Sequence, residues 1–158
     1  MRAFLIPMSP KQIRLLIGGK ISKVVKVNCP RGSVPFKCYV YCPSRKYQTK
    51  RAHNKAMNES GNEYSEWCGK VVAEFVSTEI KPVLQLPPLK FFEETQMGIA
   101  EYETLLSKGR SKMRVINVND LIVYGKPKEL TEFRKPDGEP FDQVIGAFTP
   151  VFVPVEEK

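Results

Sequence analysis

Cationic side chains with an aromatic residue among them form the most chemically suggestive pattern in this sequence. Thirteen lysine and arginine residues precede the first acidic residue, Glu59. Ammonium and guanidinium groups bind phosphates, and aromatic rings stack on nucleobases. The pattern predicts a nucleic-acid contact through these residues: Lys20, Lys23, Lys26, Arg31, Arg45, Lys46, Tyr47, Lys50, Arg51 and Lys55. A solvated basic surface is the alternative interpretation.

The distribution of charge along the sequence makes residues 1–58 the basic part of the chain. Residues 59–158 carry twelve basic and all seventeen acidic residues, a net charge of −5, whereas the whole chain has a net charge of +8. A basic N-terminal part of this kind is compatible with an anionic partner, although it does not identify one.

Cysteine and histidine are the other residue types with potential chemistry. The four cysteines are Cys29, Cys38, Cys42 and Cys68, and no two have C-x-x-C spacing; His53 is the single histidine. On one strand Cys38 and Cys42 would lie roughly 13 Å apart on the same face, too far for a disulfide or a shared metal. We therefore expect free thiols in a reducing cytosol, and neither a metal nor a cofactor.

Two strands are expected to organise the elements that position these residues. Residues 36–42 and 70–76 are rich in β-branched and aromatic residues and lie between turn-forming clusters. In the first strand Phe36, Cys38, Val40 and Cys42 would face the core, and Lys37, Tyr39 and Tyr41 the other side. If Tyr39 and Tyr41 are exposed, they could also stack on a base.

Local signals predict the elements around these strands. Ser9 caps a helix with Pro10 at its first position and Gln12 completing a capping box, and Gly18-Gly19 ends it. The other expected elements are strands at 2–6, 21–27, 69–81, 115–124 and 143–153, a short helix at 99–108, helical turns at 127–133, a Pro-rich connection at 82–96 and a basic flexible insertion at about 44–67. Val118, Leu121 and Val123 are the expected core residues of the strand at 115–124.

This order of elements predicts an α+β fold with a mixed sheet or small barrel, and the length of 158 residues predicts one domain over 1–158. No stretch is long and apolar enough to span a membrane, and residues 3–8 are too short for a signal peptide, so we expect a cytoplasmic protein.

Four blocks in this order resemble the ASCH-domain family of the PUA-like superfamily, especially its phage and bacterial members. They are Ser-Pro-x-x-x-x-x-Leu-Ile-x-Gly-x-Lys (9–20), Pro-Phe-Lys-x-Tyr-Val-Tyr-Cys (35–42), Gly-Lys-Val-Val-Ala-Glu-Phe (69–75) and Asp-Leu-x-x-Tyr-x-Lys-Pro-Lys-Glu-Leu-x-Glu-Phe (120–133). The resemblance implies a small mixed β-barrel with a helix after the first strand and a second short helix. It also implies a cleft, lined by the segment after the first helix, that in related domains faces RNA or modified nucleosides.

The chain departs from the family pattern at three places, one of which is the usual C-terminal Ser-Trp-Cys-like ending, replaced here by Phe148-Thr-Pro-Val-Phe152. Family members usually have Gly-Glu-Lys-Thr followed by an acidic residue and an Arg, whereas here Ile21 holds the Thr position, Lys23 the acidic position and Val25 the Arg position. Many members also carry a Trp-His pair just before the Asp-Leu block, where this chain has Ile116-Asn117.

Some ASCH enzymes resemble acetylcytidine amidohydrolases, which use a Lys, a Thr and a Glu. The resemblance implies Lys20 for the Lys, Ser22 as the only nearby hydroxyl and Glu74 as a carboxylate. A hydroxyl nucleophile needs an adjacent base, so this hypothesis requires Ser22 and Glu74 to meet.

The sequence leads to three hypotheses. The first is a non-catalytic module that binds RNA or another single-stranded nucleic acid through a basic cleft. The second is a phage-type regulator or inhibitor that binds a protein partner. The third is an acetylcytidine-type amidohydrolase. None of them specifies an oligomeric state.

Overall fold

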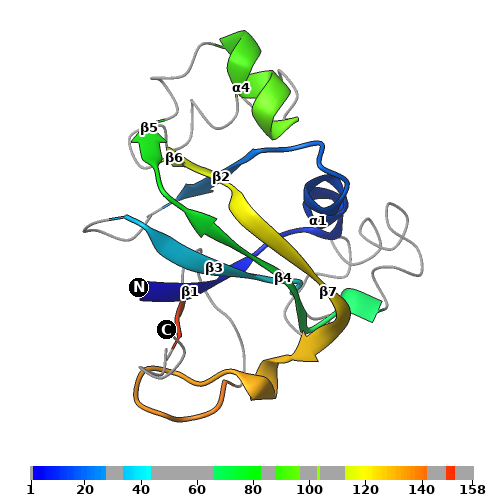
Figure 1. Cartoon of the computed structure of the whole chain (residues 1–158), viewed down its shortest axis with the longest axis vertical. Coiled ribbons are helices and arrows are strands. Elements are labelled where there is room, and N and C mark those ends of the chain that lie inside the picture. The colour runs from blue at the N-terminus through cyan, green and yellow to red at the C-terminus, as the bar shows by residue number, and fades with distance from the viewer. Residues whose placement is uncertain are drawn as a thin grey trace.

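Two β-sheets and their flanking helices form the computed structural model, which describes residues 2–27, 34–43, 66–82, 88–96, 103, 113–141 and 149–151 (Figure 1). The five-stranded sheet has the order β7-β4-β3-β1-β8, with bounds Asn119–Glu129, Lys70–Ser77, Phe36–Tyr41, Arg2–Pro7 and Thr149–Pro150. The three-stranded sheet has the order β2-β6-β5, with bounds Lys23–Val27, Met113–Asn117 and Ile80–Pro82. The helices with defined bounds are α1 (Pro10–Ile17) and α4 (Pro88–Thr95).

The helix that follows β1 forms as its local sequence predicts. The Ser9 side chain accepts a hydrogen bond from the Gln12 backbone N–H at 3.2 Å, and Pro10 begins the helix. Ile13 and Leu16 are buried on one side of α1. The helix places this apolar side on the sheet and leaves its other side in solvent.

Strands β3 and β4 are central, as predicted. They pair antiparallel, with Cys38 opposite Phe75 and Tyr39 opposite Glu74, while β1 pairs parallel to β3 and makes the sheet mixed. Because side chains alternate along a strand, Cys38 and Val40 face the main core and Tyr39 faces the other side of the sheet.

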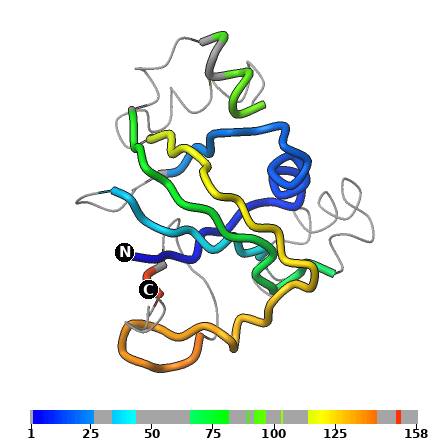
Figure 2. Tube along the Cα trace, viewed as in Figure 1, coloured from blue at the N-terminus to red at the C-terminus, as the bar shows by residue number. Residues whose placement is uncertain are grey.

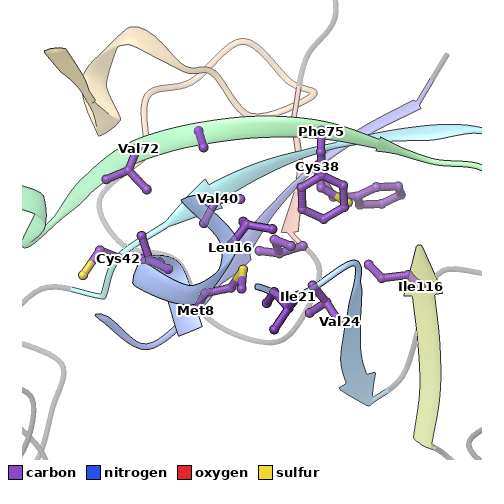
Figure 3. Packing of buried hydrophobic residues seen from close by; sticks show 14 of the residues in the cluster. Met8, Leu16, Ile21, Val24, Cys38, Val40, Cys42, Val72, Phe75 and Ile116 are labelled. Atoms are coloured by element: carbon purple, nitrogen blue, oxygen red, sulfur yellow. The ribbon is translucent and has the colours of Figure 1, made fainter. Parts of the chain in front are cut away.

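The main core lies between the five-stranded sheet, α1 and the start of the second sheet. Figure 3 shows Leu16 of α1 beside Val40 of β3, Phe75 above Cys38, and Ile116 of β6 at the rim. Phe4 and Phe36 meet edge to face at 5.6 Å between ring centroids. Burial of this cluster is the main source of stability for the fold.

A second hydrophobic cluster covers the opposite face of the same sheet. Its members are Ala3, Leu5, Tyr41, Val71, Leu130, Phe133, Phe141 and Val151. Leu130 and Phe133 pack inward as predicted, from a 3-10 helix at Leu130–Glu132 that begins only after β7 ends. The prediction that Tyr41 could be exposed is wrong, because this cluster buries it to 2% exposure.

The strands predicted at 69–81 and 115–124 are each broken in two. The first becomes β4 and β5, interrupted at Thr78 and Glu79, and the second becomes β6 and β7, interrupted at Val118. The segment β4–β5 stays paired with the segment β6–β7 on both sides of the break, because β4 pairs with β7 and β5 pairs with β6. Each segment therefore runs from one sheet into the other (Figure 2). The interruption lets one antiparallel pair of segments contribute to two sheets.

The side-chain amide of Asn117 lies at the break between β4 and β5 and hydrogen-bonds to the residues there. Its Oδ1 accepts hydrogen bonds from Ser77 Oγ at 3.1 Å and from the backbone N–H groups of Thr78 at 2.8 Å and Glu79 at 3.0 Å. Its Nδ2 donates to Thr78 Oγ1 at 2.8 Å. The side chain therefore replaces the ladder hydrogen bonds that the kink removes.

Other predictions need correction or lie outside the described residues. Residues 88–95 form α4, where a Pro-rich connection was expected, and Val123 is 42% exposed where core was expected. Val118 and Leu121 do pack against the main core. Most of the predicted helix at 99–108 and of the insertion at 44–67 lies outside the described residues, and β8 is the described part of the last strand. Within the described chain no ring of paired strands closes the two sheets into the predicted barrel.

Candidate nucleic-acid interface

The C-terminal end of α1 places Lys20 in solvent. Gly19 has φ +71°, and the Lys20 N–H donates to the Leu15 carbonyl at 2.9 Å while the Gly19 N–H donates to the Leu16 carbonyl at 3.1 Å. This pattern is a Schellman motif, which needs a left-handed residue and suits glycine there. The turn ends the helix and leaves the Lys20 side chain exposed.

Lys11 and Arg14 extend the exposed positive charge along α1. They are one helical turn apart, so they lie on one side of the helix, away from Ile13 and Leu16. Both are exposed, and no acidic residue lies in α1. We call Lys11, Arg14 and Lys20 the α1 basic surface. Lys11 and Arg14 are not among the predicted site residues, although their helical spacing in the sequence indicates a shared exposed side.

The segment after α1 is fixed by alternating core and polar contacts. Ile21 and Val24 enter the main core. Between them, Ser22 donates its backbone N–H to the Glu94 carbonyl at 2.8 Å and accepts from the Val118 N–H at 3.0 Å. This segment is thereby tied to both α4 and the β6–β7 junction.

Lys23 lies inside an ion-pair network and is only 15% exposed. Its Nζ is 3.3 Å from Glu94 Oε2 and 3.7 Å from Glu79 Oε1, and Glu79 also pairs with Lys81 at 3.4 Å. Two lysines and two glutamates therefore balance one another. In this arrangement Lys23 does not present its charge to an external phosphate.

Lys26 is also engaged within the protein. Its Nζ donates a hydrogen bond to the Pro7 carbonyl oxygen at the end of β1, and its side chain is half-buried. Of the described cations that the sequence predicted for the interface, Lys20 alone is exposed. The remaining predicted residues lie outside the described part of the chain: Arg31, Arg45, Lys46, Tyr47, Lys50, Arg51 and Lys55.

Glu74 is held on the opposite face of the five-stranded sheet. Its carboxylate accepts a hydrogen bond from Tyr124 Oη at 3.0 Å and pairs with Lys37 Nζ at 3.0 Å, and its side chain is 16% exposed. Burial of Tyr124, and then the charge and hydrogen bond of Glu74, raise the pKa of the Tyr124 phenol well above its usual value. Lys128 lies over the Tyr124 ring at 4.5 Å, so the cluster is closely packed.

The aromatic residues of β3 are part of the packing on this face. Tyr39 meets Phe133 at 4.9 Å between ring centroids, and Tyr41 is buried. Burial leaves Tyr41 no open face for base stacking, and Tyr39 is half-buried with Phe133 and Lys37 against its ring. Tyr47, which lies outside the described residues, stays the predicted stacking residue.

The three residues implied for amidohydrolase chemistry do not form one site. Ser22 Oγ donates to Glu94 Oε2 at 3.5 Å, whereas the two Glu74 oxygens contact Tyr124 and Lys37. Ile21 and Val24 beside Ser22 pack into the main core, and Glu74 faces the other side of the sheet. Ser22 therefore does not meet Glu74, the carboxylate that the resemblance implies, and the carboxylate that it does contact, Glu94, is ion-paired with Lys23, so the geometry does not favour this activity.

The described cysteines have the character of core residues. Cys38 and Cys42 are buried and Cys68 is half-buried, with Cys42 and Cys38 both in the main core. Burial, and then the nearby Cys68, raise the pKa of Cys42 to about 12, so its thiol stays protonated and unreactive at neutral pH. Among the described residues no three His, Cys, Asp or Glu side chains gather where they could hold a metal. None of the described helices combines the length and apolarity needed to cross a membrane.

Solved structures include one with the same fold as this chain. The crystal structure of ASCH from Zymomonas mobilis is similar with a TM-score of 0.52 and 12% sequence identity, over 98% of this chain and 90% of that chain. A likeness at this identity establishes the fold, so the chain has an ASCH-domain fold, as its sequence motifs predicted. No protein-family model matches the sequence, and neither does any curated protein.

Proposed function

We propose that this ASCH-fold chain is a non-catalytic module that binds RNA or another single-stranded nucleic acid through the α1 basic surface. The observation that carries the proposal is the exposure of Lys11, Arg14 and Lys20 on one short helix and its exit turn, in a part of the sequence without acidic residues. The fold is compatible with the proposal but does not decide it, because one fold supports many functions.

The physical basis of the proposed binding is release of counterions from phosphates. Each lysine or arginine that neutralises a phosphate of a single strand contributes about −0.7 to the slope of log K against log salt. Three contacts from the α1 basic surface would give a slope of about −2. The predicted cations between Arg45 and Lys55 would add to it, and Tyr47 would supply stacking.

Replacing charges on α1 tests this proposal, with fluorescence anisotropy of a labelled single-stranded RNA over a range of KCl concentrations. The variant Lys11→Gln/Lys20→Gln removes two exposed cations and leaves the core untouched. We expect affinity to fall about tenfold or more at low salt, and the slope to shrink by about 1.4. Lys23 is left intact because its replacement would break an internal ion-pair network.

The matched control is Lys126→Gln/Lys135→Gln, which also removes two positive charges. They lie in residues 126–135, a segment that begins in β7 and continues past its end. Figure 1 shows this segment away from α1. If the control weakens binding as much as the α1 variant, binding follows net charge rather than this surface. Binding without salt dependence, or no binding by the unaltered chain, would contradict the proposal.

A protein partner is the second candidate function, as expected for a phage-type regulator or inhibitor. The observation that favours it is the exposure of two consecutive apolar residues on the edge strand β7, Ile122 at 54% and Val123 at 42%. Edge strands with apolar side chains can pair with other chains. A protein that co-purifies from nuclease-treated lysate with the unaltered chain, but not with Ile122→Ser, would support this function.

A further inference from the structure

The C-terminal end of helix α4 is joined to the segment after α1 by polar contacts of Glu94 with Ser22 and Lys23. The helix packs against β2, and none of its described side chains belongs to either hydrophobic cluster. Leu89 on this helix is 83% exposed. Figure 1 shows α4 beyond β5 and β6, away from the five-stranded sheet. Elements with little buried apolar contact open at lower free energy than the core.

The polar contacts between α4 and the segment after α1 converge on Glu94. Glu94 Oε2 lies 3.3 Å from Lys23 Nζ and 3.5 Å from Ser22 Oγ, and the Glu94 carbonyl accepts from the Ser22 N–H at 2.8 Å. An ammonium and a hydroxyl directed at one anionic oxygen are also the donors that bind a phosphate oxygen. Ser22 and Lys23 are separated only by Ile21 from Lys20, which belongs to the α1 basic surface.

We propose that α4 is a displaceable cover over Lys23, and that a phosphate of the bound nucleic acid takes the place of the Glu94 carboxylate beside Lys23 and Ser22. Displacement of the helix would add Lys23 to the α1 basic surface. The inference rests on the proposed function and deepens it by naming how the site is regulated: the protein's own acidic side chain competes with the ligand for the same cation.

A pair of adjacent substitutions tests the cover. Glu94→Gln and Glu93→Gln each remove one negative charge from α4, but only Glu94 contacts Lys23, and Glu93 is exposed. We expect Glu94→Gln to bind a short single-stranded RNA about tenfold more tightly than Glu93→Gln, the effect of about one charge-assisted hydrogen bond. Its salt slope should be steeper by about 0.7, for one more phosphate contact. Adding Lys23→Gln to Glu94→Gln should abolish the gain.

Hydrogen exchange on the unaltered chain gives a readout that needs no variant. If RNA displaces the cover, the backbone amides of residues 89–96 should exchange faster when RNA is bound. Unchanged or slower exchange of this segment at saturating RNA would overturn the inference, as would equal affinities of the two glutamine variants.

The two proposals fail in different ways. If the chain binds RNA and loses binding in Lys11→Gln/Lys20→Gln, but Glu94→Gln behaves like Glu93→Gln, the function stands and the cover is wrong. If neither the unaltered chain nor either glutamine variant binds RNA, both proposals are wrong.

Discussion

Replacing Asn117 with alanine should destabilise the protein more than its position outside the core suggests. The side chain fills the break between β4 and β5, where Oδ1 accepts three hydrogen bonds and Nδ2 donates one. Alanine would leave the Glu79 N–H without this acceptor and would leave the Ser77 hydroxyl with the Glu79 carbonyl, at 3.2 Å, as its remaining acceptor. Ser77 is completely buried, so water reaches its hydroxyl poorly.

The loss in free energy of unfolding depends on which of the hydrogen-bond donors can bond to water in place of Asn117. A hydrogen bond contributes about 1 kcal/mol net, and a buried donor left unsatisfied costs about 1–3 kcal/mol. The bonds to Thr78 are exposed, so water replaces most of their contribution, whereas those from Ser77 and Glu79 are partly buried. We therefore expect Asn117→Ala to lower the free energy of unfolding by about 2–3 kcal/mol.

Urea denaturation followed by circular dichroism measures this loss, with an unchanged m-value as evidence of an unchanged unfolding transition. Asn119→Ala is the matched control, because its amide makes only longer bonds of 3.4 and 3.2 Å; its loss should be below about 1 kcal/mol. Asn117→Asp keeps the acceptor oxygen, so its loss in free energy of unfolding should lie between those of Asn117→Ala and Asn119→Ala. A loss of less than about 0.5 kcal/mol in Asn117→Ala would refute the reasoning.

Two further predictions concern buried titratable groups. The pKa of Cys42 is about 12 in the folded protein against 9.0 for an ordinary thiol, so its contribution to stability is complete below pH 9 and is lost as the pH rises toward 12, at about 1.4 kcal/mol per pH unit. The stability advantage of the unaltered chain over Cys42→Ala, measured by urea denaturation, should therefore shrink above pH 9, and a constant difference would contradict the burial of this thiol. Tyr124→Phe removes the hydrogen bond to Glu74 but leaves the ion pair with Lys37, so we expect a loss of about 1 kcal/mol in the same assay. No measurable loss would mean that water replaces the phenol.

Local signals in the sequence predicted the elements that form from neighbouring residues. Ser9, Pro10 and Gly18-Gly19 mark both ends of α1 because capping depends on residues within a turn of the helix end. The alternation of Cys38 and Val40 with Tyr39 likewise predicted which side of β3 faces the main core.

Features that depend on distant residues were beyond local reasoning. The local sequence predicts Lys23 to be an exposed cation. In the structure α4 and the β4–β5 break bring Glu94 and Glu79 into ion pairs with it. Tyr41 is buried by a segment that follows β7, and nothing near Tyr41 in sequence indicates that the second face of the sheet is covered. Helix α4 was missed because prolines precede it, although proline is favoured in the first turn of a helix.

The pairing of β1 with β8 has a consequence for the order of folding during synthesis. Phe4 lies opposite Pro150, and the Val151 N–H donates to the Ala3 carbonyl at 3.0 Å, so β1 is joined to a strand that the ribosome synthesises much later. Until residue 151 has emerged, β1 has one unpaired edge beside the apolar side chains of Ala3 and Leu5. A nascent chain stalled before that point would lack the β8 partner of this edge, so we expect it to pair with other chains more readily than a chain that includes β8.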